Sequence, residues 1–484
     1  MFKIEELAQA QNIELRRVGD GFAVVDCSLT NLESTVFYLK NHMGFAFLCG
    51  INFDKTAQTT GALWYWLENI EIGFSLGIRV SCRVEEKLPS LGSIFKNAAT
   101  MEAELAGGGD VKVEPKGVCA FNRDAAAPAW RNSVEAGEVD ESFHNFGWLK
   151  KPLNSYGEQE FSAVSRDDIV LKCETSTGYY GNSIEEKLVL KNAPNVADHL
   201  LKYDGYDGVV WSGMFLRALE EANKIELPDK AQAIRMIFFE LSRVLGHLEF
   251  VAQIAFHLKA TSFYFKILRW TFQIEKLQTA YSGNMYNLGI FTLGGIHRAP
   301  PPHWISTCLK RLAQMQSELA SETEKIVQNA FWRRIADVGV VSPKDLVEWG
   351  ITGCALRASG INFDLRKRKP FYLYHEVDFE TPIGINGSLF DRLLIRLQES
   401  SQSMGIISQL LDNLPTGELV SEDLGHFSHF KGLEIDSVEK EYRESVEQVP
   451  LLEDNECFCS METSRGIAIL FARTKNSKVE RLYL

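Results

Sequence analysis

The chain has 484 residues, of which 45% are hydrophobic and 24% are charged, and its formal net charge is −13. This length predicts two or three domains, and the composition is that of a soluble globular protein. An acidic chain is not expected to bind nucleic acid, which requires a basic face. Nine scattered cysteines without a secretory leader predict free thiols in a reducing compartment. No apolar run approaches the roughly 18 residues that span a bilayer, so we expect no transmembrane segment.

The first part of the chain alternates strand-like and helix-like segments. Residues 21–27 and 44–53 are rich in the aromatic and β-branched residues typical of strands, and residues 63–84 predict two strands around a turn. Residues 31–43 have apolar positions at helical spacing. These segments predict a small α/β domain with a mixed sheet. It is followed by the linker-like stretch RDAAAPAW at residues 123–130.

The second part of the chain is predominantly helical in pattern. Three long segments have apolar residues three and four positions apart, namely 231–260, 304–335 and 388–414. The first has apolar residues on nearly every face, which predicts a buried central helix in an antiparallel bundle. The strand-like alternation returns in residues 456–484. The predicted fold class is therefore α+β, with an α/β domain over residues 1–120, a linker over 121–155, and a mainly α-helical bundle domain with small flanking β-sheets over 156–484.

Several residues can act in chemistry but also have ordinary structural explanations. His247 and His257 are ten residues apart on the predicted central helix, so they do not share a face. A single histidine inside a helix is more often a hydrogen-bonded core residue than a ligand or catalyst. Cys457 and Cys459 are spaced C-x-C, but a zinc site needs further ligands, so buried thiols are the favoured interpretation. Glu240 lies three residues before Arg243, where the two side chains can pair.

A basic block at residues 366–369 stands out in this acidic chain. Gly353, Gly360 and Pro370 bracket the block, which indicates a shaped loop and not a regular helix. Within the loop, Arg357 and Asp364 are candidates for a charge-assisted bracing pair. No phosphate-binding glycine loop, nucleophile elbow or dinucleotide fingerprint is present in the sequence. From these patterns alone, the sequence does not identify a reaction.

The segment around this block matches a family pattern of T-G, L-R-x-S-G, D-x-R-K and P-Y followed by a tyrosine. The matching residues are Thr352, Gly353, Leu356, Arg357, Ser359, Gly360, Asp364, Arg366, Lys367, Pro370 and Tyr374. With these residues the chain resembles the large-subunit family shared by the respiratory complex I 49 kDa (D) subunit and membrane-bound [NiFe] hydrogenases. The N-terminal part resembles the complex I 30 kDa (C) subunit, so the chain looks like the fused C–D large subunits of hydrogenase-4 and formate hydrogenlyase.

The resemblance implies roles for several residues. It implies structural or interface roles for Arg243, Arg357, Asp364, Arg366, Lys367 and Arg392. It implies quinone-proximal positions for Tyr203, Tyr206 and His247, and a catalytic position for His257, where the family has an acidic residue. His257 is either a titrating proton donor or an ordinary helix-end residue. The motifs of the family's active site are eroded: the paired C-x-x-C ligands of nickel and the histidine-bearing hairpin of the quinone pocket are absent from the sequence.

These similarities imply a subunit of a complex I-like or hydrogenase-4-like membrane-associated oxidoreductase. Such a subunit forms the quinone-proximal platform for electron transfer from NAD(P)H, or another donor, through Fe–S clusters to quinone. The expected partners are a 20 kDa-type Fe–S subunit and membrane subunits, with NAD(H) and the clusters on partners, quinone at an interface, and no metal or nickel on this chain. The expected location is the cytoplasmic side of the inner membrane, through those partners. The alternative is a catalytically silent scaffold of a complex I-derived ion-translocating or assembly complex; a [NiFe] hydrogenase functional by itself is not expected.

Overall fold

The structure, a computed structural model, describes most of the chain outside two longer gaps around residues 122–142 and 422–453. The described residues are 14–19, 22–55, 59–69, 72–84, 86–107, 112–113, 120–121, 143–150, 159–166, 169–177, 184–421 and 454–484. The chain forms two compact units. Unit 1 comprises Met1–Ser183 with Glu348–Gly350, and unit 2 comprises Ile184–Val347 with Ile351–Leu484.

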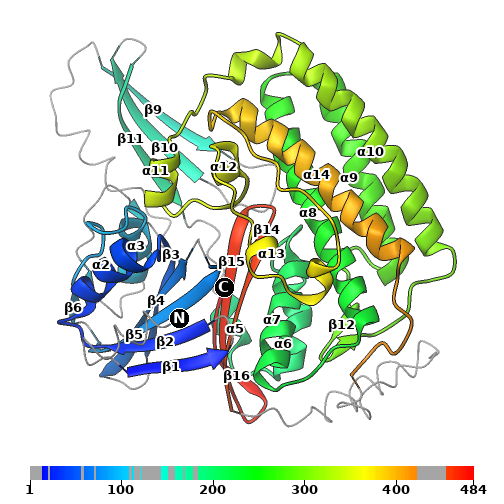
Figure 1. Cartoon of the computed structure of the whole chain (residues 1–484). Coiled ribbons are helices and arrows are strands. Elements are labelled where there is room, and N and C mark those ends of the chain that lie inside the picture. The colour runs from blue at the N-terminus through cyan, green and yellow to red at the C-terminus, as the bar shows by residue number, and fades with distance from the viewer. Residues whose placement is uncertain are drawn as a thin grey trace. The chain divides into compact units, whose positions relative to one another are not determined.

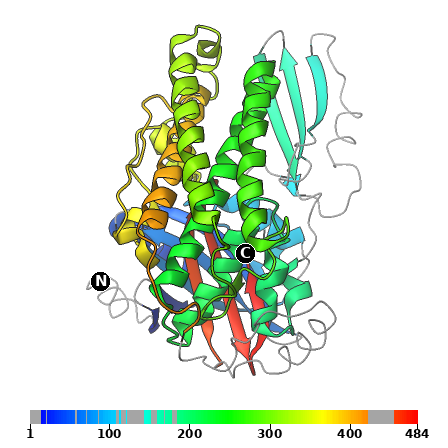
Figure 2. The ribbon, with the colours of Figure 1, turned by 90° about the vertical axis from the view of Figure 1, so that its right-hand side faces the viewer.

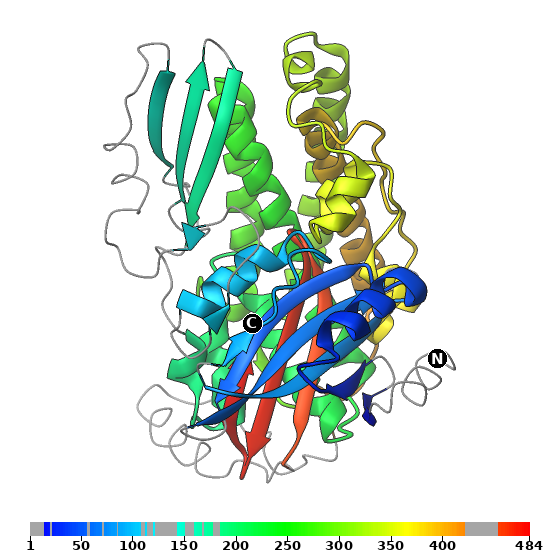
Figure 3. The same ribbon diagram turned by 90° about the vertical axis from the view of Figure 1, so that its left-hand side faces the viewer.

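Unit 1 is built on a five-stranded mixed sheet with the order β1-β2-β5-β4-β3. Strands β2 and β5 are parallel, and the other neighbouring pairs are antiparallel. Helix α2 places the fully buried Leu32, Val36 and Leu39 against this sheet. Figure 3 shows α2 and α3 on one face of the sheet. The bounds are β1 (Glu14–Gly19), β2 (Phe22–Cys27), α2 (Leu32–Met43), β3 (Phe47–Lys55), β4 (Thr60–Asn69), β5 (Phe74–Arg83) and α3 (Ala98–Gly107).

These elements confirm the predicted small α/β domain with a mixed sheet. The alternation of side chains along β4 explains its place in the core, because Leu63, Tyr65 and Leu67 all point to the face covered by α2. Unit 1 also contains a pair of short strands, β6 (Lys87–Leu88) and β7 (Lys112–Val113), and a second sheet of order β8-β11-β10-β9. Its strands are β8 (Ala120–Phe121), β9 (Phe143–Lys150), β10 (Gln159–Arg166) and β11 (Ile169–Thr177). Most of the expected linker, residues 121–155, lies outside the described residues, apart from Phe121 and strand β9, so the predicted domain boundaries stay a prediction.

Unit 2 is a helical bundle with small sheets (Figure 1). Among the described residues its four long helices are α8 (Asp229–His257), α9 (Thr261–Ser282), α10 (Trp304–Gln328) and α14 (Leu389–Asp412). The sequence analysis predicted three of them, α8, α10 and α14, but did not predict α9. The remaining elements are α5 (Ile184–Leu188), α6 (Ala193–Leu200), α7 (Gly208–Ala222), β12 (Phe291–Thr292), β13 (Gly295–Ile296), α11 (Pro343–Glu348, whose last residue belongs to unit 1), α12 (Gly353–Ala358), α13 (Leu365–Arg368), two short 3-10 helices (Trp332–Ile335 and Tyr372–His375), β14 (Glu456–Thr463), β15 (Gly466–Lys475) and β16 (Lys478–Tyr483).

Helix α8 is the centre of the bundle, as its pattern predicts. It packs against α14, α9 and α7, and nearly every side chain from Ala231 to Ala255 is buried. Polar residues on this helix are buried as well, among them Arg235, Glu240 and His247. A buried polar group must find a partner inside the protein, so these residues require matching groups on other elements.

The C-terminal strands β14, β15 and β16 form an antiparallel sheet, which confirms the strand-like interpretation of the tail. Cys457 and Cys459 are buried in β14, and burial raises the pKa of their thiols to about 12 and about 11. They are buried neutral thiols, as predicted. Within the described ranges, no helix has both the length and the apolar composition that a membrane crossing needs.

Candidate functional site: a buried ion-pair frame and an exposed basic loop

Three segments of unit 2 that are far apart in sequence pack closely together: helix α8, the start of helix α12 and the turn between β14 and β15. On α8, a Cβ added to Gly246 would lie 2.1 Å from Ser464 Oγ in the turn between β14 and β15. At the start of α12, Gly353 has a φ of +68°, and an added Cβ would lie 2.6 Å from the Cα of Gly466. Glycine is needed at Gly246 for space, and at Gly353 for both space and conformation. This close approach brings the charged side chains of α8, α12, α14 and β14 together.

Arg357 on α12 is the centre of the resulting cluster and is completely buried. It binds two carboxylates: its Nε lies 2.5 Å from Glu399 Oε1, and its Nη1 lies 2.7 Å from Glu462 Oε1. The same Nη1 also donates to the carbonyl of Phe363. The predicted pair between Arg357 and Asp364 is wrong, because the carboxylates of α14 and β14 occupy the guanidinium instead.

The two carboxylates respond differently to this shared cation. Burial alone would raise the pKa of Glu399, but Arg357 and His247 together lower it well below the ordinary value. Burial raises the pKa of Glu462, and Arg357 offsets only part of that rise. Glu399 is therefore the firmly ionised partner of Arg357. We call Arg357, Glu399 and Glu462, together with the cluster described next, the buried frame.

A second cluster of the buried frame centres on Arg366, the first residue of the basic block. Arg366 Nη2 lies 2.7 Å from Asp364 Oδ2, and its Nη1 lies 3.1 Å from Glu240 Oε1 on α8. Asp364 also caps α13 by accepting the backbone N–H of Arg366. Burial opposes ionisation of Asp364, yet Arg366 lowers its pKa to about 2. The predicted pair of Glu240 and Arg243 is confirmed at 3.4 Å, and Tyr374 donates its hydroxyl to Glu240.

His247 lies beside the first cluster, in contact with Cys354 and Glu399. One possible ligand atom from each of these residues lies within 4.8 Å of the others, and all three are buried. Arg396 Nη1 lies 3.3 Å from His247 Nδ1, and a guanidinium can only donate, so Nδ1 accepts. The proton of the neutral ring is then on Nε2, which lies 3.2 Å from Glu399 Oε2. A metal would need Nε2 without its proton, so this donor set does not suit a metal ion.

The environment keeps His247 neutral. Burial lowers its pKa to about 4, although Glu399 raises it, and the nearby Arg396 and Arg243 lower it further. Burial likewise raises the pKa of the Cys354 thiol to about 12, and that thiol donates to Glu399 Oε2 at 3.2 Å. His247 is thus a hydrogen-bonded core residue in a network of charges.

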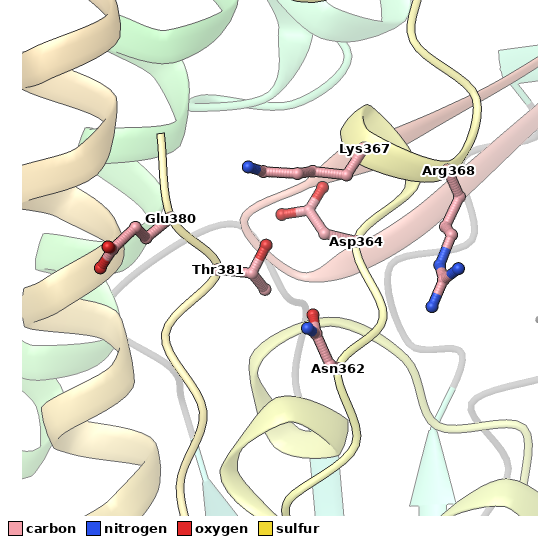
Figure 4. Close-up of a pocket in the computed structure, with 6 residues that line it drawn as sticks. All are labelled: Asn362, Asp364, Lys367, Arg368, Glu380 and Thr381. Atoms are coloured by element: carbon pink, nitrogen blue, oxygen red, sulfur yellow. The ribbon is translucent and has the colours of Figure 1, made fainter. Parts of the chain in front are cut away.

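The basic block divides into an inner and an outer half. Arg366 is 2% exposed, whereas Lys367 and Arg368 are exposed. The outer half borders an open hollow of about 550 Å³. The hollow is lined by Asn362, Asp364, Lys367, Arg368, Glu380 and Thr381 (Figure 4).

The polar character of this hollow follows from its lining side chains. Lys367 lies on one side of it, with Asn362 and Thr381 across from it (Figure 4), and the Lys367 Nζ lies 4.4 Å from the centre of the Phe379 ring. The carboxylate of Asp364 is already bound by Arg366. Exposed cations beside an amide and a hydroxyl make the hollow suitable for polar contacts with another molecule.

The predicted quinone-proximal and catalytic residues have different surroundings. His257 is the last residue of α8 and is exposed, with its ring 5.6 Å from that of Phe256. It lies roughly 15 Å along the helix axis from the buried His247. Tyr203 is 36% exposed and meets Trp211 edge to face. Tyr206 is partly buried against the bundle core, and its carbonyl accepts the hydroxyl of Ser242.

The guanidinium of Arg392 on α14 donates hydrogen bonds to backbone carbonyl groups. Its Nη2 donates to the carbonyl of Gly387 at 2.9 Å and also to that of Gly339, so it connects two loop segments. The helix begins with a capping box between Ser388 and Asp391. Burial and the neighbouring Arg396 lower the pKa of Arg392.

The sequence analysis assigned no role to Cys354, and it matched Arg396 and Glu399 to an R-x-x-E pattern of the resembling family without placing them in this cluster. A signal for Glu399 was present, because it lies on the face of α14 that also holds Ile395, Ser403 and Ile406, all buried. A carboxylate on an apolar helix face requires a buried cation as partner. Which cation it meets depends on tertiary structure.

The fold and the site together define an α+β protein of two units. In its helical bundle, ion pairs connect helices and a strand that are far apart in sequence. Residues 260–481 match the family model described as respiratory-chain NADH dehydrogenase, 49 kDa subunit. Over this segment, the chain is similar to that family.

Individual relatives agree with this similarity. The chain is 36% identical over 214 residues to the D-type subunit of the NADH-quinone oxidoreductase of Rickettsia prowazekii, covering 43% of this chain and 54% of the relative. It is 32% identical over 261 residues to the corresponding D-type protein of Orientia tsutsugamushi, covering 53% and 65%. It is 28% identical over 271 residues to the C/D-type subunit of the NADH-quinone oxidoreductase of Bdellovibrio bacteriovorus, covering 56% and 48%. The last name agrees with the predicted fusion of a C-like part to a D-like part, and the matches span roughly half to two thirds of these relatives' length.

Proposed function

We propose that the chain is a subunit of a complex I-like or hydrogenase-4-like membrane-associated oxidoreductase. In this role it forms the quinone-proximal platform on which a 20 kDa-type Fe–S subunit and membrane subunits assemble. Electrons pass from NAD(P)H, or another donor, through clusters held by partners to quinone. The observation on which the proposal depends is the family match over residues 260–481, the segment that contains Arg357, Arg366, Glu399 and Glu462.

The geometry supports the platform role. The buried frame connects α8, α12, α13, α14 and β14 through ion pairs, so these elements behave as one rigid body. The outer half of the basic block, Lys367 and Arg368, borders the open polar hollow. A rigid body that offers exposed cations and amide groups is suited to a polar protein interface. Such a subunit lies on the cytoplasmic side of the inner membrane through its partners.

A second candidate function is a catalytically silent scaffold in a complex derived from complex I. The surroundings of His247 favour it. A proton donor for quinone reduction needs a pKa near the working pH, whereas burial lowers the pKa of His247 to about 4 and its Nδ1 accepts a hydrogen bond from Arg396. His257 is the remaining titrating candidate, and it is an exposed residue at the end of a helix.

One experiment tests both functions. The tagged chain is isolated from its native membranes in mild detergent, its partners are identified by mass spectrometry, and NAD(P)H:quinone reductase activity is measured. We expect an Fe–S subunit among the partners and quinone reduction that disappears when the chain is removed. An Fe–S partner without quinone reduction supports the scaffold. A preparation without any oxidoreductase subunit contradicts both.

A further inference from the structure

Helix α9 has two apolar faces, of which the bundle uses one. The inner face comprises the buried side chains Phe263, Ile267, Trp270, Ile274 and Leu277. The outer face has Phe265, Leu268 and Phe272, whose exposed fractions are 63%, 40% and 56%. At about 100° per residue these three positions lie within about 60° of one another, on the side opposite to the inner face. Figure 2 shows α9 beside α10 in the bundle.

The outer apolar row continues onto the end of α8. Phe256 is 44% exposed, and its ring lies 5.7 Å from that of Tyr264. Tyr264 in turn lies 5.7 Å from Phe265. We call Phe256, Phe265, Leu268 and Phe272 the α9 strip. Single exposed apolar residues are ordinary, but a continuous row of large ones marks an interaction surface.

Positive charge lies at both ends of the α9 strip. The Lys259 Nζ lies 5.5 Å from the centre of the Phe256 ring, and the Lys276 Nζ lies 4.6 Å from that of Phe272. The two cations between them are already paired with α10, as Lys266 with Glu322 and Arg269 with Glu318. In the described part of the chain, the ammonium groups of Lys259 and Lys276 contact aromatic rings, so both remain accessible to carboxylates of another molecule.

We propose that the α9 strip docks an amphipathic helix of a partner protein, with an apolar seam flanked by carboxylates. The spacing i, i+3, i+7 is that of a helix seam, into which the side chains of a facing helix can pack. Aromatic residues are enriched in protein interfaces. Carboxylates on either side of the partner's seam would meet Lys259 and Lys276. A bilayer surface fits less well, because anionic lipids repel a chain with a net charge of −13.

The test uses the full chain and two synthetic three-heptad helical peptides with the same leucine seam, one flanked by Glu and the other by Lys. Binding is measured by fluorescence anisotropy at low and at moderate salt. We expect the Glu-flanked peptide to bind about tenfold more tightly than the Lys-flanked one, and salt to reduce the difference. Leu268→Glu should abolish binding of the Glu-flanked peptide. The double variant Lys259→Glu/Lys276→Glu should reverse the preference between the peptides.

Controls separate this surface from general stickiness and from unfolding. Phe37→Ser removes another exposed phenylalanine, 55% exposed on α2 of unit 1, and should leave peptide binding unchanged. Circular dichroism melting should show that each variant is folded. Equal binding of both peptides, no binding of the Glu-flanked peptide, or binding that survives Leu268→Glu would overturn the proposal. Vesicles containing phosphatidylglycerol provide a further arm: if they bind the chain through Leu268 while the Glu-flanked peptide does not, the strip is a lipid-binding surface and the proposal is wrong.

Discussion

The buried frame places charged side chains in the interior of the protein, whereas the α9 strip places apolar side chains at its surface. In the frame, Arg357, Glu399 and Glu462 are charged and completely or almost completely buried. In the strip, Phe265 and Phe272 are apolar and mostly exposed. The frame satisfies its charges within the chain, so its purpose can be found in this structure. The strip has no such partner among the described residues, and we propose that it binds another molecule. A buried polar residue and an exposed apolar residue are therefore informative for different reasons.

The largest expected effect tests the frame. Arg357→Ala removes the cation shared by Glu399 and Glu462 and leaves two buried carboxylates without compensation. We expect the free energy of unfolding of the full chain to fall by roughly 3–5 kcal/mol, measured by urea denaturation. If the loss is below about 1 kcal/mol, the ion pairs do not hold the bundle together.

The pH dependence of stability tests the protonation of His247. Its pKa is about 4 in the folded chain and 6.5 ordinarily, so the unfolded chain binds the proton more readily between these values. His247 therefore contributes stability above about pH 6.5 that is progressively lost as the pH falls toward 4. Relative to the His247→Asn variant, the wild type should lose about 2 kcal/mol between about pH 7 and about pH 5. Parallel curves for the two proteins would show that His247 is not kept neutral by the fold.

The close approach of α8 to the β14–β15 turn should be sensitive to one methyl group. Gly246→Ala places a Cβ at 2.1 Å from Ser464 Oγ, and we expect a loss of about 1–3 kcal/mol in the free energy of unfolding. Adding Ser464→Gly removes the side chain that clashes and should restore part of the loss, which a double-mutant cycle would measure. A purely additive cycle would show that the two residues do not meet.

The smallest expected effect compares the two halves of the basic block. Lys367→Ala should change the free energy of unfolding by less than about 0.5 kcal/mol, because Lys367 is exposed. Arg366→Ala, one residue earlier, should cost several times more, because it removes the partner of Asp364 and Glu240. Equal effects of the two substitutions would contradict the division into an inner and an outer half.

The sequence predicted most of the long elements, but it did not predict helix α9 (Thr261–Ser282). The α/β unit, the buried α8 and the strands of the tail all follow from apolar periodicity. The boundary between α8 and α9 lies at Leu258–Ala260, where Lys259 has a φ of +60°. The predicted segment 231–260 ends at this turn, although no glycine or proline marks it and a lysine rarely adopts that conformation.

The charged pairs show a similar limit. Local spacing correctly predicted the pair of Glu240 and Arg243, which are one helical turn apart. For Arg357 it suggested the nearby Asp364, whereas the actual partners are 42 and 105 residues away. Side chains so distant in sequence meet only through the packing of α12, α14 and β14. The resemblance to a family identified these residues as important but not as partners of one another.

Because β14 contributes to the buried frame, the frame cannot be completed during translation until β14 has been synthesised. Arg243 donates to the carbonyls of Glu462 and Thr463, and Arg357 requires the carboxylate of Glu462. During translation, about two hundred residues are added after α8 before these acceptors emerge from the ribosome. Until then Arg243 on the central helix lacks its two carbonyl acceptors and Arg357 lacks one of its two carboxylates, so a compact bundle is disfavoured. The nascent chain should therefore depend on holding chaperones until the β14–β15 hairpin has been synthesised.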